Sequence, residues 1–122
     1  GLVGSEMCIR DRYIDRAQIE QVLINLIKNA KESCGQNTAP QIEVELEQVP
    51  GKVCSLTVRD NGEGILPEVI DKVFVPFFTT KPSGSGIGLS LCKQIMNLHG
   101  GTITVSSEIG KGSCFTLMFP GR

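Results

Sequence analysis

The sequence predicts an α/β fold, a two-layer sandwich in which helices cover one face of a mixed sheet of about four to five strands. Two long segments, 15–34 and 85–99, repeat apolar residues at the helical period. Shorter segments in two pairs alternate apolar and polar residues, as strands do. At 122 residues the chain can bury one core, and we expect one domain.

Composition argues against several classes of function. The formal net charge is −1, so charge gives no reason to expect nucleic acid or an anionic membrane as a partner. No apolar run approaches the roughly 20 residues of a membrane helix. The five cysteines are scattered without a C-x-x-C pair, which is typical of reduced, buried thiols rather than of disulfides or a zinc site. We therefore expect a cytoplasmic, monomeric domain, and any membrane anchor of a full-length protein would lie elsewhere.

The first twelve residues have no clear period and no starting Met. They resemble a translated sequencing-adaptor fragment, so residues 1–12 are expected to be a non-native or disordered tail and residues 13–122 the domain. The alternative is an ordinary mobile N-terminal tail. In both cases we expect the chain to be the C-terminal piece of a longer protein.

A helix is expected from Asp15 to Ser33. Asp15 is a suitable N-cap, Gln18 follows three residues later as in a capping box, and Gly35 ends the pattern. One face of this helix is apolar and is formed by Ile19, Val22, Leu23, Leu26, Ile27 and Ala30.

Two asparagines, Asn25 and Asn29, lie one turn apart along the edge of that apolar face. Asparagine is a mediocre helix former, so two of them beside a core face require a reason. They could be amides that are hydrogen-bonded at the margin of the core. Alternatively, Asn29 could be a neutral oxygen ligand for Mg²⁺, an ion that takes one or two protein oxygens together with phosphates.

Two strands are expected next, at 42–46 and 53–60, and the second ends at Asp60. The residues that follow, Asn61-Gly62-Glu63-Gly64-Ile65, form a turn by default. In the functional alternative, Asp60 accepts a hydrogen bond from an exocyclic amine such as adenine N6. A site built around such an acceptor would reject guanine, which carries a carbonyl at that place.

The segment after this turn is expected to hold a short helix at 67–73 with Pro67 at its start. Phe74-Val75-Pro76-Phe77-Phe78 is expected to form a compact aromatic cluster that anchors a loop. Lys81, in that loop, is either a solvated charge or the cation that neutralises a transferred phosphoryl group.

Three glycines at alternate positions, Gly84, Gly86 and Gly88, lead into the last helical segment. Glycine lets a backbone approach a ligand closely, and a helix N-terminus attracts anions, so the pattern indicates a phosphate site. It matches neither the Rossmann fingerprint nor the P-loop, and a flexible hinge is the alternative.

The last helix is expected over 85–98, with Ile87, Leu91, Ile95 and Leu98 on its inner side. It ends at His99-Gly100-Gly101, and we expect His99 to be structural because no acid or nucleophile neighbours it in the sequence. Two strands, at 102–105 and 113–119, are joined by a Gly-Lys-Gly turn at 110–112.

The order of these motifs resembles that of sensor histidine kinases. Their N box resembles NLIKNAKES at 25–33, the first glycine box DNGEG at 60–64, the F box FVPFFTTK at 74–81, the second glycine box GSGIGL at 84–89, and the third GKGSCF at 110–115. Five boxes in this order cover nearly all of residues 15–120. The chain is similar to the catalytic domain of the gyrase/Hsp90-like ATPase superfamily, with its Bergerat-type ATP-binding fold, in the nitrogen-regulator-like branch.

The resemblance implies ATP and Mg²⁺ as cofactors and assigns roles to residues. Asn29 would bind the metal, Asp60 the adenine amine, and Asn25 and Lys81 would be catalytic. The other nucleotide contacts would be Gly62, Gly64 and Ile65, then Gly84, Ser85, Gly86, Ile87, Gly88 and Leu89. Asn25 stands where hydrolysing relatives have a water-activating Glu, and an amide cannot act as that base.

The function implied is that of a protein-histidine kinase fragment, which donates the γ-phosphoryl group to a histidine on a separate dimerisation domain and, through it, to a response regulator. No H-[DE] phosphoacceptor helix is found in this sequence, and His99 does not fit that role. Two alternatives remain: a hydrolysing ATPase or anti-sigma-type serine kinase of the same superfamily, and a degenerate module that only binds a partner.

Overall fold

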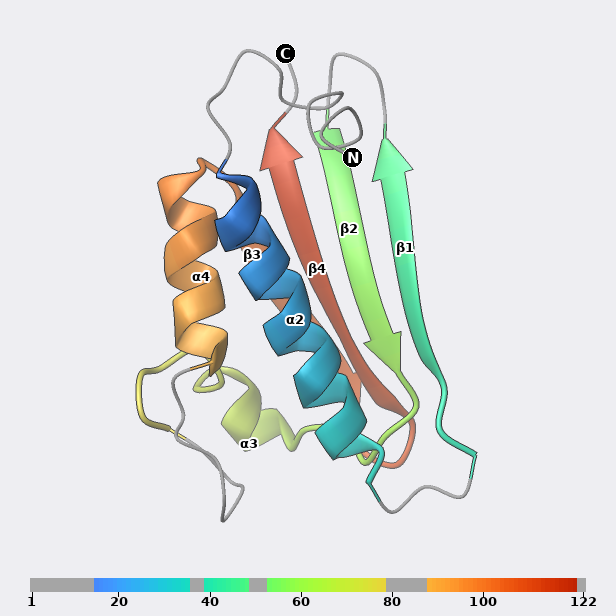
Figure 1. The fold of residues 1–122 in the computed structure, drawn as a ribbon. Helices are drawn as coiled ribbons and strands as arrows, with labels where there is room; N and C mark the ends of the chain where they lie inside the picture. The colour runs from blue at the N-terminus through green and yellow to red at the C-terminus, as the bar shows by residue number, and fades with distance from the viewer. Residues whose placement is uncertain (1–14, 36–38, 49–52, 79–87, 121–122) are drawn as a thin grey trace.

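The computed structural model describes residues 15–35, 39–48, 53–78 and 88–120. Along the chain they form α2 (Arg16–Ser33), β1 (Ile42–Gln48), β2 (Val53–Asp60), α3 (Pro67–Ile70), α4 (Gly88–Leu98), β3 (Thr102–Glu108) and β4 (Gly112–Pro120). Figure 1 shows α2 and α4 side by side on one face of the sheet, with the short α3 at the end of the sheet where β2 ends. The predicted two-layer α/β sandwich is confirmed.

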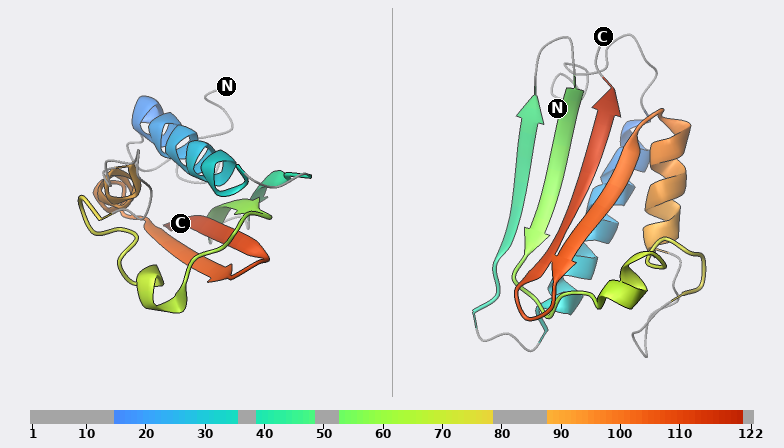
Figure 2. Two further views of the ribbon diagram at one scale, coloured as in Figure 1. Left: turned by 90° about the horizontal axis from the view of Figure 1, so that it is seen from below. Right: turned by 180° about the vertical axis from the view of Figure 1, so that it is seen from behind.

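The described sheet has four strands in the order β1-β2-β4-β3. All three pairings are antiparallel, so the prediction of a mixed sheet was wrong for this part of the chain. The alternation of apolar and polar residues predicts each strand, but it does not predict which strand it pairs with. β1 with β2 and β3 with β4 pair as consecutive strands, and β4 then lies antiparallel to β2 over eight residue pairs. The view from behind in Figure 2 shows this order on the face of the sheet opposite α2 and α4.

Helix α2 begins and ends where the sequence predicts. The Asp15 side chain accepts a hydrogen bond from the Gln18 backbone N–H at 3.2 Å, which satisfies one of the free donors of the first turn. At the other end, Cys34 and Gly35 donate backbone hydrogen bonds to the last turn of the helix. Val22, Leu26 and Ala30 are buried, as their spacing on one face requires.

The core lies between the two long helices and the sheet. Cys92, Ile95 and Met96 of α4 meet the residues of α2, and the strands contribute Cys54, Val58, Ile103, Phe115, Leu117 and Phe119. The inner face expected for the last helix was partly wrong, since Leu98 is 72% exposed. The buried row of α4 continues from Ile95 to His99, four residues on, and this leaves Leu98 on the flank of the helix.

The aromatic cluster expected at 74–78 does not form as a unit. Phe74 packs on the core and meets Phe115 edge-on, with ring centroids 6.3 Å apart. The Lys93 ammonium lies 5.6 Å from the centroid of the Phe74 ring. Phe77 instead has a positive φ of 68° and is 75% exposed, so a single phenylalanine of the segment anchors it to the core.

Candidate functional site

Asp60 is the last residue of β2 and one of the few buried charged residues among those described. Its Oδ1 accepts a hydrogen bond from the Gly62 N–H at 2.8 Å, so the carboxylate closes its own turn. In the pairing of β2 with β4, Asp60 lies opposite Ser113, another buried polar residue. The strand therefore ends in a fixed, buried hydrogen-bond acceptor, as the functional alternative for this motif requires.

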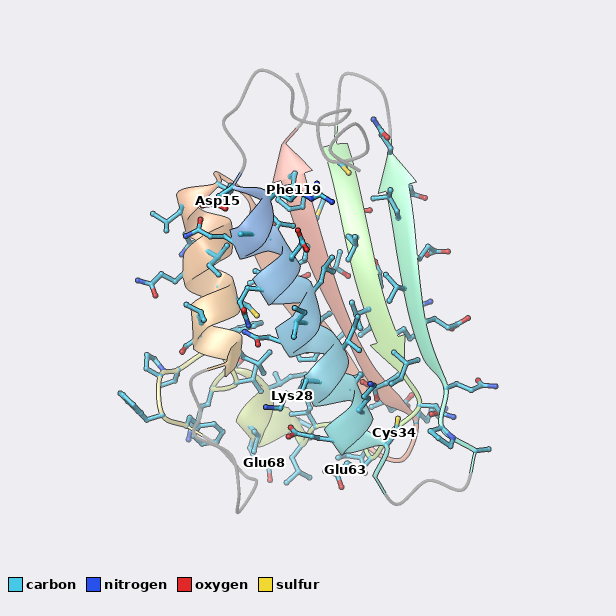
Figure 3. All side chains as sticks on the ribbon, in the orientation of Figure 1. Asp15, Lys28, Cys34, Glu63, Glu68 and Phe119 are labelled. Carbon is cyan, nitrogen blue, oxygen red and sulfur yellow. The ribbon has the colours of Figure 1, made fainter. Side chains whose placement is uncertain are left out.

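The turn after Asp60 is held on one side by the end of α2. The Glu63 N–H donates to the Ser33 carbonyl at 3.2 Å. A Cβ placed on Gly62 would lie 2.5 Å from the Ser33 carbonyl oxygen and 2.7 Å from its carbon. Only glycine lets the turn approach the helix this closely. Figure 3 shows Glu63 beside the end of α2 that carries Cys34, at the opposite end of the helix from Asp15.

The hairpin between β3 and β4 holds the other side of the turn. Gly110 donates its N–H to the Glu63 carbonyl at 2.9 Å. Gly64 has a φ of +83°, and a Cβ there would lie 2.9 Å from the Glu108 carbonyl carbon and from the Ile109 Cα. The two glycines of this motif thus serve close backbone packing on two different neighbours, which bring the turn to one defined place.

Asn61, to which the sequence reasoning gave no role, ties the segment before β1 to this turn. Its Oδ1 accepts from the Gln41 N–H at 2.8 Å, and its Nδ2 donates to the Ala39 carbonyl at 3.0 Å. The Cys34 thiol lies 3.5 Å from the same Oδ1. Asparagine after a strand is a weak signal in sequence, because these partners lie 20 or more positions away.

Ser107 was also missed by the sequence reasoning. Its hydroxyl, on β3, accepts a hydrogen bond from the Ile65 N–H at 2.7 Å and donates to the Gly112 carbonyl at 2.8 Å. A serine inside an alternating strand pattern gives no sign that it holds a loop 42 residues away.

The two asparagines of α2 lie on the flank that faces the start of α4. Asn25 Nδ2 donates to the Gly88 carbonyl at 3.4 Å, and its Oδ1 accepts from the Gln21 side chain at 3.0 Å. Asn29 is half-buried one turn further along. Asn29 lies one helical turn before Ser33, whose carbonyl accepts from the Glu63 N–H, so Asn29 lies close to the chain turn that follows Asp60.

The structure thus brings together most of the site residues that lie in its described part. Asp60, Gly62, Gly64 and Ile65 share one turn, and Ile65 and Leu89 pack against the core. Asn25 contacts Gly88, the first residue of α4. Five predicted residues lie outside the described residues: Lys81, Gly84, Ser85, Gly86 and Ile87.

Two reactive side chains near α4 have structural surroundings. His99 is buried; its Nδ1 lies 2.8 Å from the Ile95 carbonyl, and its Nε2 accepts from the Asp15 N–H at 3.0 Å. Nδ1 therefore carries the hydrogen, and both ring nitrogens are used, which confirms the structural role expected for His99. Burial raises the pKa of the Cys92 thiol to about 11, although a hydrogen bond with Asn25 acts in the opposite direction, so Cys92 stays protonated.

Comparison with known proteins agrees with this geometry. The family of histidine kinase-, DNA gyrase B-, and HSP90-like ATPases matches residues 14–122, and the chain belongs to this family. Within it, the chain is an ATP-binding catalytic domain of the sensor histidine kinase type.

Three relatives illustrate the similarity. The sensor histidine kinase ZraS of Escherichia coli K12 is 41% identical over 106 residues, which are 87% of this chain and 22% of ZraS. The catalytic domain of histidine kinase ThkA is 38% identical with a TM-score of 0.76, over 88% of this chain and 69% of that one. Full-length ShkA in complex with AMPPNP is 25% identical with a TM-score of 0.78, over 90% and 23%. The chain therefore spans about a fifth of the length of its curated relative ZraS.

Within the described residues, no helix combines the length and apolar character needed to cross a bilayer.

Proposed function

We propose that this chain binds Mg²⁺-ATP between α2, the turn at 60–65 and the start of α4, and donates the γ-phosphoryl group to a histidine on a separate dimerisation domain. That histidine would pass the group to a response regulator. The observation that carries the proposal is Asp60, a buried acceptor whose turn is fixed by glycine contacts on both sides. The nucleotide analogue in the ShkA complex supports an adenine nucleotide as the ligand.

Asp60 would accept the hydrogen bond of the adenine amine. Its Oδ1 accepts from the Gly62 N–H, and a carboxylate has further lone pairs with which it can accept a second donor. Such a group favours a donor and leaves a guanine carbonyl facing an acceptor, which costs affinity. Gly62, Gly64 and Ile65 would form the wall beside the ring.

Asn29 would hold the Mg²⁺. An amide oxygen is a hard, neutral ligand of the kind that this ion accepts, and it adds no negative charge beside a triphosphate. The metal, when bound, would neutralise charge on the transferred phosphoryl group. The segment that carries Lys81, Gly84, Ser85, Gly86 and Ile87, and then Gly88 and Leu89, would contact the phosphates.

Asn25 would help to place the reacting end of the nucleotide, and its chemistry disfavours hydrolysis. The amide is tied to the Gly88 carbonyl and the Gln21 side chain, and it cannot remove a proton from water. The alternative function, a hydrolysing ATPase or serine kinase, predicts steady release of phosphate by the isolated chain. We propose instead slow turnover and a phosphoryl group held for transfer.

Titration calorimetry with Mg²⁺-ATP tests the site. Asp60→Asn should weaken binding about 10- to 100-fold, the range for a hydrogen bond to a charged group, and should reduce the preference for ATP over GTP. The matched control is Asp71→Asn, an exposed carboxylate beyond α3. Asn29→Ala should weaken binding in Mg²⁺ more than binding of ATP with EDTA, whereas Asn97→Ala, an exposed asparagine of α4, should change neither. Unchanged affinity in both Asp60→Asn and Asn29→Ala would refute the proposal.

The remaining parts of the proposal concern the whole protein. We propose that residues 13–122 are the catalytic domain, with 1–12 outside it, and that this domain is monomeric, works in the cytoplasm and binds no nucleic acid. With γ-labelled ATP, the chain alone should incorporate no label at His99, while the full-length protein should be labelled on its phosphoacceptor histidine. Label on His99 would contradict the assignment.

A further inference from the structure

The Ser107 hydroxyl has every hydrogen-bonding position filled. A serine hydroxyl offers one donor hydrogen and two acceptor lone pairs. Ser107 Oγ accepts from the Ile65 N–H at 2.7 Å, donates to the Gly112 carbonyl at 2.8 Å, and lies 2.9 Å from Ser113 Oγ. Because its only hydrogen goes to Gly112, the hydrogen between the two hydroxyls comes from Ser113.

These contacts hold the Asp60 turn at two separate points. Ile65 is the residue at the far end of the turn, and its N–H is fixed by Ser107 directly. Gly112 packs on the near end, since a Cβ there would lie 2.9 Å from the Asp60 carbonyl carbon and from the Asn61 Cα. Ser107 therefore sets where both ends of the turn stand relative to β3 and β4.

The Ser107 hydroxyl also determines whether the Ser113 hydroxyl can donate a hydrogen bond to other groups. Ser113 is buried and lies opposite Asp60 in the strand register. With its hydrogen committed to Ser107, Ser113 presents only lone pairs to its surroundings. Ser113, opposite Asp60, therefore acts as a hydrogen-bond acceptor, and neither the Ser107 nor the Ser113 hydroxyl has a hydrogen left for a ligand carbonyl.

We propose that Ser107 is a positioning residue that determines the selectivity of the site for a 6-aminopurine, by holding the Asp60 turn and by keeping Ser113 an acceptor. This inference rests on the proposed function of the site. Ser107 acts through Ile65, Gly112 and Ser113, and it touches no ligand itself.

The test compares two nucleotides in the wild-type chain and three variants by titration calorimetry. The nucleotides are Mg²⁺-ATP and Mg²⁺-purine riboside triphosphate, which lacks the 6-amino group. Ser107→Ala should weaken ATP binding about tenfold and the analogue far less, so that the ratio of the two dissociation constants falls toward one. Ser107→Thr keeps the hydroxyl and should restore the ratio. Ser106→Ala is the matched control, because Ser106 is an exposed neighbour on the same strand.

A merely structural role gives a different result. If Ser107→Ala weakened the binding of both nucleotides equally, or of neither, the ratio of the dissociation constants would stay at its wild-type value and the inference would be overturned. Should Ser107→Ala fail to fold, Ser107→Cys, with a thiol as a poorer donor and acceptor, provides the same comparison and should also lower the ratio. A wild-type chain without affinity for Mg²⁺-ATP would overturn the proposed function, whereas wild-type binding with an unchanged ratio in the variants overturns this inference alone.

Discussion

Replacing Gly62 with alanine should destabilise the fold and weaken nucleotide binding together. The added Cβ would lie 2.5 Å from the Ser33 carbonyl oxygen and 2.7 Å from its carbon, where ordinary contact begins at 3.4 Å. The turn must therefore move from α2 by nearly 1 Å. Overpacking by one methyl group costs about 1–3 kcal/mol. The same displacement would weaken the hydrogen bond from the Glu63 N–H to the Ser33 carbonyl, which adds about 1 kcal/mol to the loss of stability.

The expected loss is thus about 2–4 kcal/mol of the free energy of unfolding, which for a domain of this size lowers the melting temperature by about 10 °C. Scanning calorimetry measures this change, and titration calorimetry below the melting temperature should show Mg²⁺-ATP binding weakened at least about tenfold, because Asp60 moves with the turn. Gly88→Ala is the stability control. A Cβ at Gly88 meets no atom within 4 Å, so its melting temperature should be unchanged or slightly raised.

A second substitution identifies the atoms responsible. Ser33→Gly removes the hydroxyl that the new methyl would meet, but the Ser33 backbone remains in its way. In a double-mutant cycle, Ser33→Gly should therefore recover less than half of the loss caused by Gly62→Ala. Full recovery, or a Gly62→Ala protein that melts and binds Mg²⁺-ATP like the wild type, would refute the reasoning from backbone contact.

Three further predictions concern the core and its polar groups. His99→Leu leaves the Asp15 N–H without its acceptor and should cost about 1–3 kcal/mol of unfolding free energy in urea, and a cost near zero would contradict the structural role of His99. Burial raises the pKa of Cys92 from 9.0 to about 11, so the thiol ionises in the unfolded chain first. The protonated thiol therefore adds to the free energy of unfolding in full below pH 9. This stabilisation is lost as the pH rises toward 11, and the loss is about 2 kcal/mol at pH 10.5. Urea titrations at pH 8 and pH 10.5 should show a smaller pH effect in Cys92→Ala, and equal pH effects would contradict the assignment. Leu26→Ala, at a fully buried position of α2, should cost about 3–5 kcal/mol, and a loss below about 1 kcal/mol would mean that the core does not close over this residue.

Local patterns in the sequence were sufficient to predict the elements. The Asp15 cap, the apolar face of α2 and the alternation in β2 depend on residues a few positions apart, so their physics is contained in short stretches of chain. The same holds for the position of Asp60 at the end of a strand, which follows from the strand pattern and the glycines after it.

The tertiary structure decided what those elements contact. The antiparallel order β1-β2-β4-β3, the exposure of Leu98 and the separation of Phe74 from Phe77 depend on which surfaces meet, and no local period encodes that. Asn61 and Ser107 hold the candidate site through hydrogen bonds that span 20 and 42 positions of sequence. Such bonds form only when the folded chain brings together residues that are far apart in the sequence, so their importance is a property of the fold and not of the residue type.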